Sequence, residues 1–297
     1  MEYVGARIDL RFVHLSKEGN MEKRPRILVV DDEPSVCKSC YRILTREGWD
    51  VDTVSSAPEA IENIRKHGYE VVITDMIMPK MSGMDLLKIV KKSTPEISVI
   101  MITGYATIKT AVLAMKLGAF DYIPKPFTPE ELSSVTDRAI QRKRLYIEIT
   151  KTEEAVEEIE FHRPGDRYYM ADHGWAQIEK DGTVRVGMDW VFRKTIGDVV
   201  NIDLPYEEDE VEQGKVCVRI TTPSMMRIHK FWSPVSGKVV EVNEEVNRDT
   251  ALVEEDPYGK GWLFRVVPSN LEEELKNLLY VDKSQVLRGK PKETTYV

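Results

Sequence analysis

Charged and hydroxyl-bearing side chains directly follow several apolar runs in the first half of the sequence. Asp31 and Asp32 follow RILVV, Asp75 ends VVITD, Thr103 ends SVIMIT, and Lys125 follows FDYIP. Three carboxylates that converge repel one another, so one takes up a proton unless a cation joins them. Hard oxygen ligands with room for water suit Mg²⁺, an ion that usually works together with a phosphate group. These residue types therefore predict a site that binds Mg²⁺ and handles phosphate.

The same residues can share the work of phosphoryl transfer. A metal ion on Asp31, Asp32 and Asp75, together with the Lys125 ammonium, would neutralise the oxygens of a phosphoryl group in transit. Thr103 offers that group a hydroxyl. Carboxylates act as nucleophiles and form acyl phosphates, and Asp75 lies between the other metal ligands and the hydroxyl. We therefore predict that Asp75 is the phosphoacceptor.

Residues 26–144 alternate between apolar runs and segments with helical spacing. The expected strands are 26–30, 50–54, 70–75, 98–103 and 120–126, and the expected helices are 34–48, 58–68, 83–93, 107–118 and 129–144. Near-continuous apolar strands separated by helices are typical of a parallel sheet covered on both faces. Ligands of such sheets lie at the carboxyl ends of the strands. The pattern predicts a five-stranded, doubly wound α/β domain with the polar residues along one edge.

This half of the chain resembles a known signalling family. The segments ILVVDDE, VVITDMIMPKMSGMDLL and VIMITGYATIKTAVLAMKLGAFDYIPKPF are similar to the receiver domain of response regulators over about residues 25–145. The resemblance implies a flavodoxin-like fold and phosphorylation of Asp75 by a sensor histidine kinase. It implies direct Mg²⁺ ligation by Asp32, Asp75 and the backbone carbonyl of Ile77, with Asp31 acting through water.

The resemblance also implies how the domain would switch. Lys125 would contact the phosphoryl group, and the peptide bond before Pro126 would be cis. Thr103 would move onto the phosphate, and Tyr122 would change rotamer with it. A phosphoryl group adds close to two negative charges, so residues 113–118, Tyr122 and the last helix would report the state of the site.

The second half has a different pattern and a second resemblance. Short alternating runs with turn signals predict a β-sandwich or barrel, followed by a helix at 269–279. HGWAQIEKDGTVRVGMDW, GDVVNIDLP, PVSGKVVEVNEEV and EEDPYGKGWLFRVVPSN resemble the H protein of the glycine cleavage system over about residues 167–280. The resemblance implies a lipoyl-domain-like fold, in a family that carries lipoyl-lysine on a hairpin.

The chain departs from the family at the lipoyl position. Counting eight residues back from Pro234 places that lysine at Met226, and counting forward from Leu204-Pro205 places it at about Ser224. Lys230 lies close by, but in neither register. We therefore expect no lipoyl attachment.

The hairpin TTPSMMRIHKFW carries an unusual number of apolar side chains, at Met225, Met226, Ile228, Phe231 and Trp232. Methionine-rich and exposed apolar surfaces adapt to protein partners, which favours a hairpin that binds a partner. The alternative is that these side chains fold inward as core.

Composition excludes several other classes of protein. With 42 Lys+Arg against 50 Asp+Glu, the net charge of −8 argues against DNA binding, and no helix-turn-helix pattern is present. No apolar run approaches the roughly 20 residues of a membrane span. Three cysteines do not make a disulfide scaffold. We expect a cytoplasmic protein that binds neither DNA nor membrane.

The expected organisation has five segments. They are an N-terminal extension at 1–24, the receiver-like domain at 25–145, a charged linker at 146–166, the H-protein-like domain at 167–282 and a tail at 283–297. Met21 is an alternative start, which would leave residues 1–20 untranslated.

Three functional hypotheses follow. The first is a response regulator, not an enzyme, in which a histidine kinase phosphorylates Asp75 and so changes how the second domain meets an unidentified protein partner, with a homodimer as one option. The second is a carrier of lipoyl or aminomethyl groups gated by phosphorylation, with Lys230 as the alternative attachment point. The third is a redox or metal protein using Cys37 and Cys40, but both lie on the apolar stripe of a helix, which favours a core role.

Overall fold

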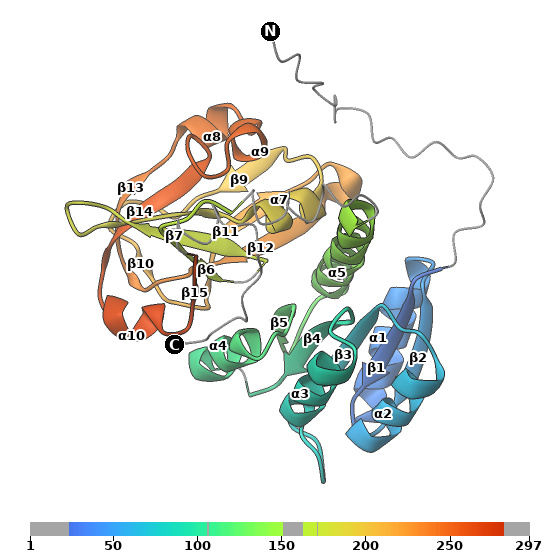
Figure 1. Cartoon of the computed structure of the whole chain (residues 1–297). Helices are drawn as coiled ribbons and strands as arrows, with labels where there is room; N and C mark the ends of the chain where they lie inside the picture. Colours follow the sequence, from blue (N-terminus) through green and yellow to red (C-terminus); the bar gives the residue numbers. More distant parts are fainter. Residues whose placement is uncertain (1–23, 106, 151–162, 171, 282–297) are drawn as a thin grey trace, which may run out of the picture.

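The computed structural model describes residues 24–105, 107–150, 163–170 and 172–281. The predicted N-terminal extension and the tail after residue 282 lie outside this range. The described chain forms two parts, a parallel α/β part drawn in blue to green and an antiparallel β part drawn in yellow to red (Figure 1). Among the described residues, no helix combines the length and the apolar character that a membrane crossing requires.

The first part is a five-stranded sheet in the order β2-β1-β3-β4-β5, with every pair parallel. Its strands are β1 (Arg26–Val30), β2 (Asp50–Val54), β3 (Val71–Asp75), β4 (Ser98–Thr103) and β5 (Asp121–Pro124), and its helices are α1 (Pro34–Arg46), α2 (Ala57–Lys66), α3 (Gly83–Ser93), α4 (Ile108–Lys116) and α5 (Pro129–Thr150). Because side chains alternate along each strand, the sheet buries two apolar layers, one under α1 and α5 and one under α2, α3 and α4. The predicted doubly wound α/β fold is confirmed.

Helix α5 is longer than its sequence pattern predicts. It continues to Thr150, into the segment expected to be a linker. The helix packs on the second part, where Arg142 lies 2.5 Å from Asp172 and helix α7 (Trp190–Ile196) lies against α5. Tertiary contacts of this kind override local propensity.

The second part consists of antiparallel sheets, as predicted. A seven-stranded sheet has the order β10-β13-β14-β8-β7-β6-β15, and a three-stranded sheet has the order β12-β11-β9. The strands are β6 (Arg167–Met170), β7 (Gly174–Ile178), β8 (Val184–Met188), β9 (Asn201–Asp203), β10 (Glu210–Val211), β11 (Val216–Thr221), β12 (Ile228–Trp232), β13 (Gly237–Val242), β14 (Trp262–Pro268) and β15 (Leu279–Val281). The helical elements are α7, the 3-10 turn η2 (Ser224–Met226), α8 (Glu245–Arg248), α9 (Leu252–Glu255) and α10 (Leu271–Leu275).

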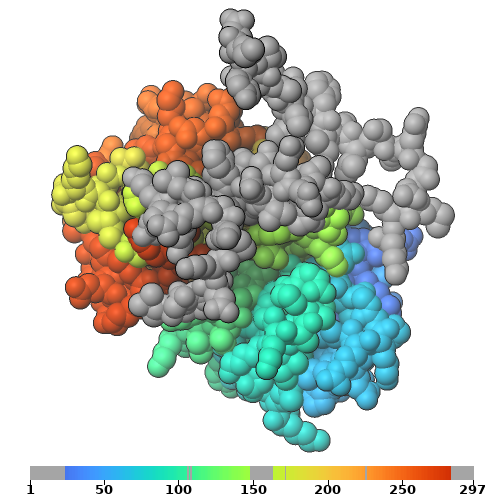
Figure 2. Space-filling view, viewed as in Figure 1, coloured from blue at the N-terminus to red at the C-terminus, as the bar shows by residue number. Residues whose placement is uncertain are grey.

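The end of this part differs from its prediction. The helix expected at 269–279 is shortened to α10, because the chain leaves it to pair β15 with β6. The two parts pack directly against each other, and Figure 1 shows α5 between the parallel sheet and the antiparallel part. Figure 2 shows the same view in space-filling form, with the first part in blue to green and the second part in yellow to red.

Candidate functional site

Three carboxylates converge at one edge of the parallel sheet. Asp31 and Asp32 follow β1 and Asp75 ends β3, and since these strands are parallel neighbours their carboxyl ends meet. One ligand oxygen from each residue lies within 4.8 Å of the others. Asp31 and Asp75 are buried, at 1% and 7% exposed, whereas Asp32 is open to solvent. The edge therefore presents two fixed carboxylates and one accessible carboxylate.

Lys125 closes this cluster from β5. Its Nζ lies 2.8 Å from Oδ2 of Asp31 and 2.9 Å from Oδ2 of Asp75. Burial lowers the pKa of Lys125, but the hydrogen bonds to both carboxylates outweigh it and raise the pKa above the usual value. Burial is also the main reason why the pKa of Asp31 is raised. The Lys125–Pro126 peptide bond is cis.

The donor set fits the Mg²⁺ that the sequence predicts. All three side chains are hard oxygen donors, and the exposed Asp32 leaves room for water, which Mg²⁺ usually retains. Ile77 lies in the loop after β3, where its N–H donates to Oδ1 of Asp75 at 3.3 Å. Asp31, Asp32, Asp75 and the Ile77 loop are therefore the groups that would hold the ion.

Gly83, which the sequence reasoning missed, permits the close approach of α3 to the end of β3 at Asp75. A Cβ atom at this position would lie 1.9 Å from the backbone oxygen of Asp75. Ser82 caps the same helix by accepting from the N–H of Asp85 at 3.2 Å. The Ser-Gly pair at the helix start was the available signal, since caps and close backbone approaches use these residues.

Thr103 and Tyr122 lie on the side of the site toward α4. Oγ1 of Thr103 accepts from the N–H of Tyr105 at 3.1 Å. The hydroxyl of Tyr122 lies 3.1 Å from Oγ1 of Thr110, which belongs to the capping box that starts α4. The Tyr122 ring packs edge-on against Trp232 of the antiparallel part, with ring centroids 6.1 Å apart. Sequence reasoning missed Thr110, which lies inside a helix, and the contact of Tyr122 with Trp232, which joins segments far apart in the sequence.

The hairpin of β11 and β12 has no lysine at its tip. Ser224 and Met226 bound the 3-10 turn, and Met226 is 66% exposed with a φ of +52°. Lys230 lies within β12, where its Nζ is 2.6 Å from Oε1 of Glu131 on α5. The lysine nearest to the predicted lipoyl register is thus held in an ion pair away from the tip.

The expected apolar surface of the hairpin is only partly present. Phe231 is fully buried and stacks on His173, and Trp232 is 5% exposed against Tyr122. Met226 and Ile228 remain exposed. For the two aromatic residues the alternative, that they fold inward, is confirmed, because Phe231 enters the core and Trp232 packs against the first part of the chain.

The cysteine pair behaves as core. Cys40 is fully buried, and burial raises the pKa of its thiol to about 12. Burial also raises the pKa of Cys37, whose Sγ lies 3.3 Å from the carbonyl oxygen of Asp31. Neither thiol has the lowered pKa of a reactive cysteine.

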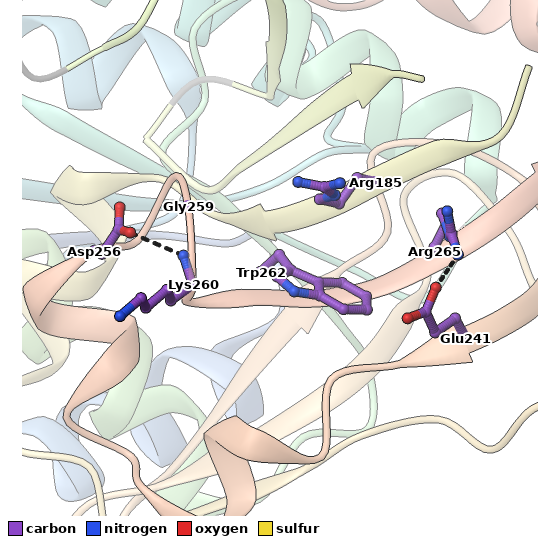
Figure 3. Close-up of a pocket in the computed structure, with 7 residues that line it drawn as sticks. All are labelled: Arg185, Glu241, Asp256, Gly259, Lys260, Trp262 and Arg265. Atoms are coloured by element: carbon purple, nitrogen blue, oxygen red, sulfur yellow. Dashed lines mark hydrogen bonds and ion pairs between the residues drawn. The ribbon is translucent and has the colours of Figure 1, made fainter. Parts of the chain in front are cut away.

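A hollow of about 380 Å³ lies on the antiparallel part, beside Trp262 (Figure 3). Both of its arginines are paired with carboxylates. Arg265 pairs with Glu241, and Arg185 lies 3.0 Å from Glu179, while Asp256 accepts from the backbone N–H of Lys260. The guanidinium charges of this hollow are therefore balanced by neighbouring carboxylates.

Comparison with known proteins assigns both parts. The family model of the response regulator receiver domain matches residues 27–137, and that of the glycine cleavage H-protein matches residues 167–288. A probable glycine cleavage system H protein of Pyrococcus abyssi is 41% identical over 116 residues, which cover 39% of this chain and 84% of the relative. The nitrogen assimilation regulatory protein NtrX of Azorhizobium caulinodans is 38% identical over 125 residues, 41% of this chain but only 28% of that protein.

One solved structure is similar in sequence to the first part. The crystal structure of a receiver domain protein from Clostridium thermocellum is 44% identical, covers 41% of this chain and 98% of its own, and has a TM-score of 0.40. The sequence identities and the family models, taken with the confirmed fold of each part, carry the conclusion. The chain therefore belongs to both families, joining a response regulator receiver domain to a glycine cleavage H-protein domain.

Proposed function

We propose that this protein is a two-component response regulator whose Asp75 accepts a phosphoryl group from a histidine kinase. The observation that carries the proposal is the arrangement of Asp31, Asp32 and Asp75 around the Lys125 ammonium, with the Thr103 hydroxyl on the next strand end. Each charge that phosphoryl transfer requires has a residue in place.

The chemistry follows from these positions. An Oδ atom of Asp75 attacks the phosphorus of a phosphohistidine, the phosphorus–nitrogen bond breaks, and the imidazole leaves with the electron pair. The product is an acyl phosphate on Asp75. When bound, Mg²⁺ would neutralise charge on the phosphoryl oxygens. Lys125, 2.9 Å from Asp75, supplies a second positive charge.

We propose further that the H-protein domain acts by binding a protein partner and carries no lipoate. The exposed Met226 at the hairpin tip and the ion pair that holds Lys230 support this reading. The alternative, a lipoyl or aminomethyl carrier gated by phosphorylation, is supported by the retained H-protein fold.

Incubation of the full chain with Mg²⁺ and acetyl phosphate, followed by Phos-tag electrophoresis, tests phosphorylation directly. We expect a retarded band that disappears with Asp75→Asn and with Mg²⁺ removed by EDTA. Asp50→Asn, an exposed carboxylate on β2, is the matched control and should leave the band unchanged. A band that survives in the Asp75→Asn variant would contradict the assignment.

A further inference from the structure

A groove of about 680 Å³ lies on the antiparallel part, between residues of its two sheets. It is lined by β9, the last strand of the three-stranded sheet, and by β10, the last strand of the seven-stranded sheet. Among the described residues each of these strands pairs on one side alone, β9 with β11 and β10 with β13. Strand edges of this kind accept extended segments from elsewhere. The groove therefore offers two strand edges and room for an extended peptide.

The lining of this groove combines apolar and acidic side chains. The apolar ones include Leu204, Tyr206, Val216 and Val242. Its carboxylates outnumber its cations, with Asp203, Asp209, Glu210, Glu212 and Glu244 against Lys215 and Arg219. Glu212 and Glu244 have cationic partners, Lys215 and Arg248. The other three, Asp203, Asp209 and Glu210, are called the acidic rim here and form no ion pair with any described residue. An occupant should therefore carry several positive charges beside apolar side chains.

The segment that follows β15 has this chemistry. Residues 282–297 read DKSQVLRGKPKETTYV and carry four cations against two carboxylates. Arg288, Lys290 and Lys292 stand at alternate positions, and such positions point to one side of an extended chain. The residues between them are a glycine and a proline, which disfavour a helix. The three cations can thus meet the acidic rim together.

The groove lies within reach of this segment because the chain before it is held beside the groove. Gln213 directly follows Glu212 of the groove lining, and its Oε1 accepts from Nδ2 of Asn277 at 2.9 Å. Nε2 of Gln213 donates to the carbonyl oxygen of Glu274 on α10 at 3.0 Å. Val281 ends β15 four residues after Asn277, at most about 14 Å of extended chain, and the segment itself can span roughly 50 Å.

We infer that the groove between β9 and β10 holds residues 282–297 of the same chain as an extended segment. The three alternate cations pair with the acidic rim, and Val286 and Leu287 cover the apolar lining. A tethered segment acts at an effective concentration of about 1 mM, which favours it over a separate partner of the same chemistry. The chain thus occupies its own peptide site, and a basic peptide binds there only by displacing this segment. The inference does not depend on the phosphorylation of Asp75.

A labelled peptide tests whether the chain's own segment occupies the groove. The probe is fluorescein-labelled DKSQVLRGKPKETTYV, added to the original protein and to a full-length variant with Arg288→Glu, Lys290→Glu and Lys292→Glu. In this segment-reversed variant the tethered competitor no longer pairs with the acidic rim. A competitor at about 1 mM weakens a peptide with a Kd of about 100 μM roughly 10-fold, so we expect at least 10-fold tighter binding to the variant by fluorescence anisotropy.

Charge reversal of the groove provides the matched comparison. Asp203→Lys with Glu210→Lys, added to the segment-reversed variant, should weaken peptide binding at least 10-fold. Glu62→Lys with Glu255→Lys makes the same change in net charge at exposed positions outside the groove, and should leave binding unchanged. Equal affinity for the original and the segment-reversed proteins would show that the segment does not occupy the groove. Binding to neither protein, or binding that ignores the rim substitutions, would show that the groove is no site for this sequence.

Carbodiimide cross-linking tests the contact in the original protein, without any substitution. The reagent joins a lysine amine to a carboxylate that lies in direct contact with it. We expect links from Lys290 or Lys292 to the acidic rim, with a yield independent of protein concentration. A yield that rises in proportion to concentration would assign the contact to a second copy of the chain and overturn the intrachain arrangement. Absence of these links would overturn the inference altogether.

Discussion

At the scale of single residues, the site depends on close approaches that few side chains permit. Lys125 reaches two buried or nearly buried carboxylates at once, and the position of Asp75 is fixed by the loop against which Gly83 packs. The sequence alone identified the carboxylates, the lysine and the hydroxyl because they follow strands. It could not identify Gly83 in the same way. The requirement at that position is for the absence of a Cβ atom beside the Asp75 backbone, and residue type and spacing alone do not indicate such a steric requirement.

Gly83→Ala should weaken both stability and phosphorylation. Its Cβ would lie 1.9 Å from the backbone oxygen of Asp75, so the loop or α3 must move. Overpacking of this kind costs about 1–3 kcal/mol, and the displaced Asp75 should react more slowly. Urea denaturation and acetyl phosphate kinetics measure the two effects. Gly68→Ala, which meets no atom within 4 Å, is the control. Wild-type kinetics in Gly83→Ala would contradict the role assigned to this glycine.

Thr103→Ala should separate phosphorylation from its consequence. The nucleophile and the ligands remain in Asp31, Asp32 and Asp75, so the acyl phosphate should still form. Without the Thr103 hydroxyl, segment 103–110 has no donor at that position for the phosphoryl group. The contact between Tyr122 and Trp232 should then remain, and the rate at which hydroxyl radicals oxidise Trp232 should not change. Hydroxyl-radical footprinting of Trp232, on samples whose phosphorylation is verified by intact mass, provides the measurement. If Trp232 is oxidised as fast in phosphorylated Thr103→Ala as in the phosphorylated original protein, the Thr103 hydroxyl does not couple the phosphate to the Tyr122–Trp232 contact.

At the scale of elements, α5 and β12 hold the two domains together. His229 on β12 lies between Ser134 of α5 and Thr222, and is 4% exposed. Burial, assisted by the positive charges of Arg138 and Arg227, lowers the pKa of His229 to about 3. While β12 is docked on α5, the imidazole ring of His229 is therefore neutral.

The docking of β12 on α5 should consequently weaken in mild acid. Release returns His229 to water, where its pKa is about 6.5. The lowered pKa in the docked form means that docking is fully favoured above pH 6.5 and loses stability as the pH falls toward 3. Between pH 7.5 and 5.5 the undocked fraction should rise about 10-fold. Trp232 footprinting at the two values tests this, and His229→Asn should flatten the response. An unchanged response in that variant would assign it to another group, such as Asp137.

The positions of the helices and strands were largely predictable from the sequence. The ends of some helices and the contacts between the two domains were not. Apolar periodicity predicts β1, β3 and β4 closely because these strands are buried on both faces. The early end of α10 depends on the pairing of β15 with the distant strand β6, and α5 contacts the equally distant Asp172 through Arg142. The same applies to Trp232, whose partner Tyr122 lies in the other domain. Sequence patterns report the local periodicity of side chains, so they do not predict contacts between residues that are far apart in the sequence.

At the scale of the whole molecule, a buried ionic cluster joins the two domains near the end of α5. Asp172 accepts from Arg142 of the receiver and from Arg163 at 2.9 Å. Burial alone would raise the pKa of Asp172, but the two arginines outweigh it and lower the pKa to about 2. The carboxylate thus stabilises the joined form above pH 4, and this contribution is lost as the pH falls toward 2.

Asp172→Asn should destabilise the whole chain. The change removes the carboxylate that pairs with Arg142 and one of the two that pair with Arg163, which keeps Asp189. Removing one partner of a buried pair costs about 3–5 kcal/mol. Thermal unfolding at neutral pH measures the loss, and the difference from the original protein should shrink below pH 3. Asp203→Asn, at an exposed position on β9, is the control. A melting temperature equal to that of the control would show that the cluster does not hold the domains together.

The central claim is that Asp75 accepts phosphate while the H-protein domain carries no lipoyl group. The intact mass of the protein purified from its native host, before and after Mg²⁺ and acetyl phosphate, tests both halves at once. We predict a single phosphoryl adduct that is absent from Asp75→Asn, and no lipoyl adduct in either protein. A lipoyl adduct, with Lys230 as the first residue to map, or a chain that never gains phosphate would contradict the account.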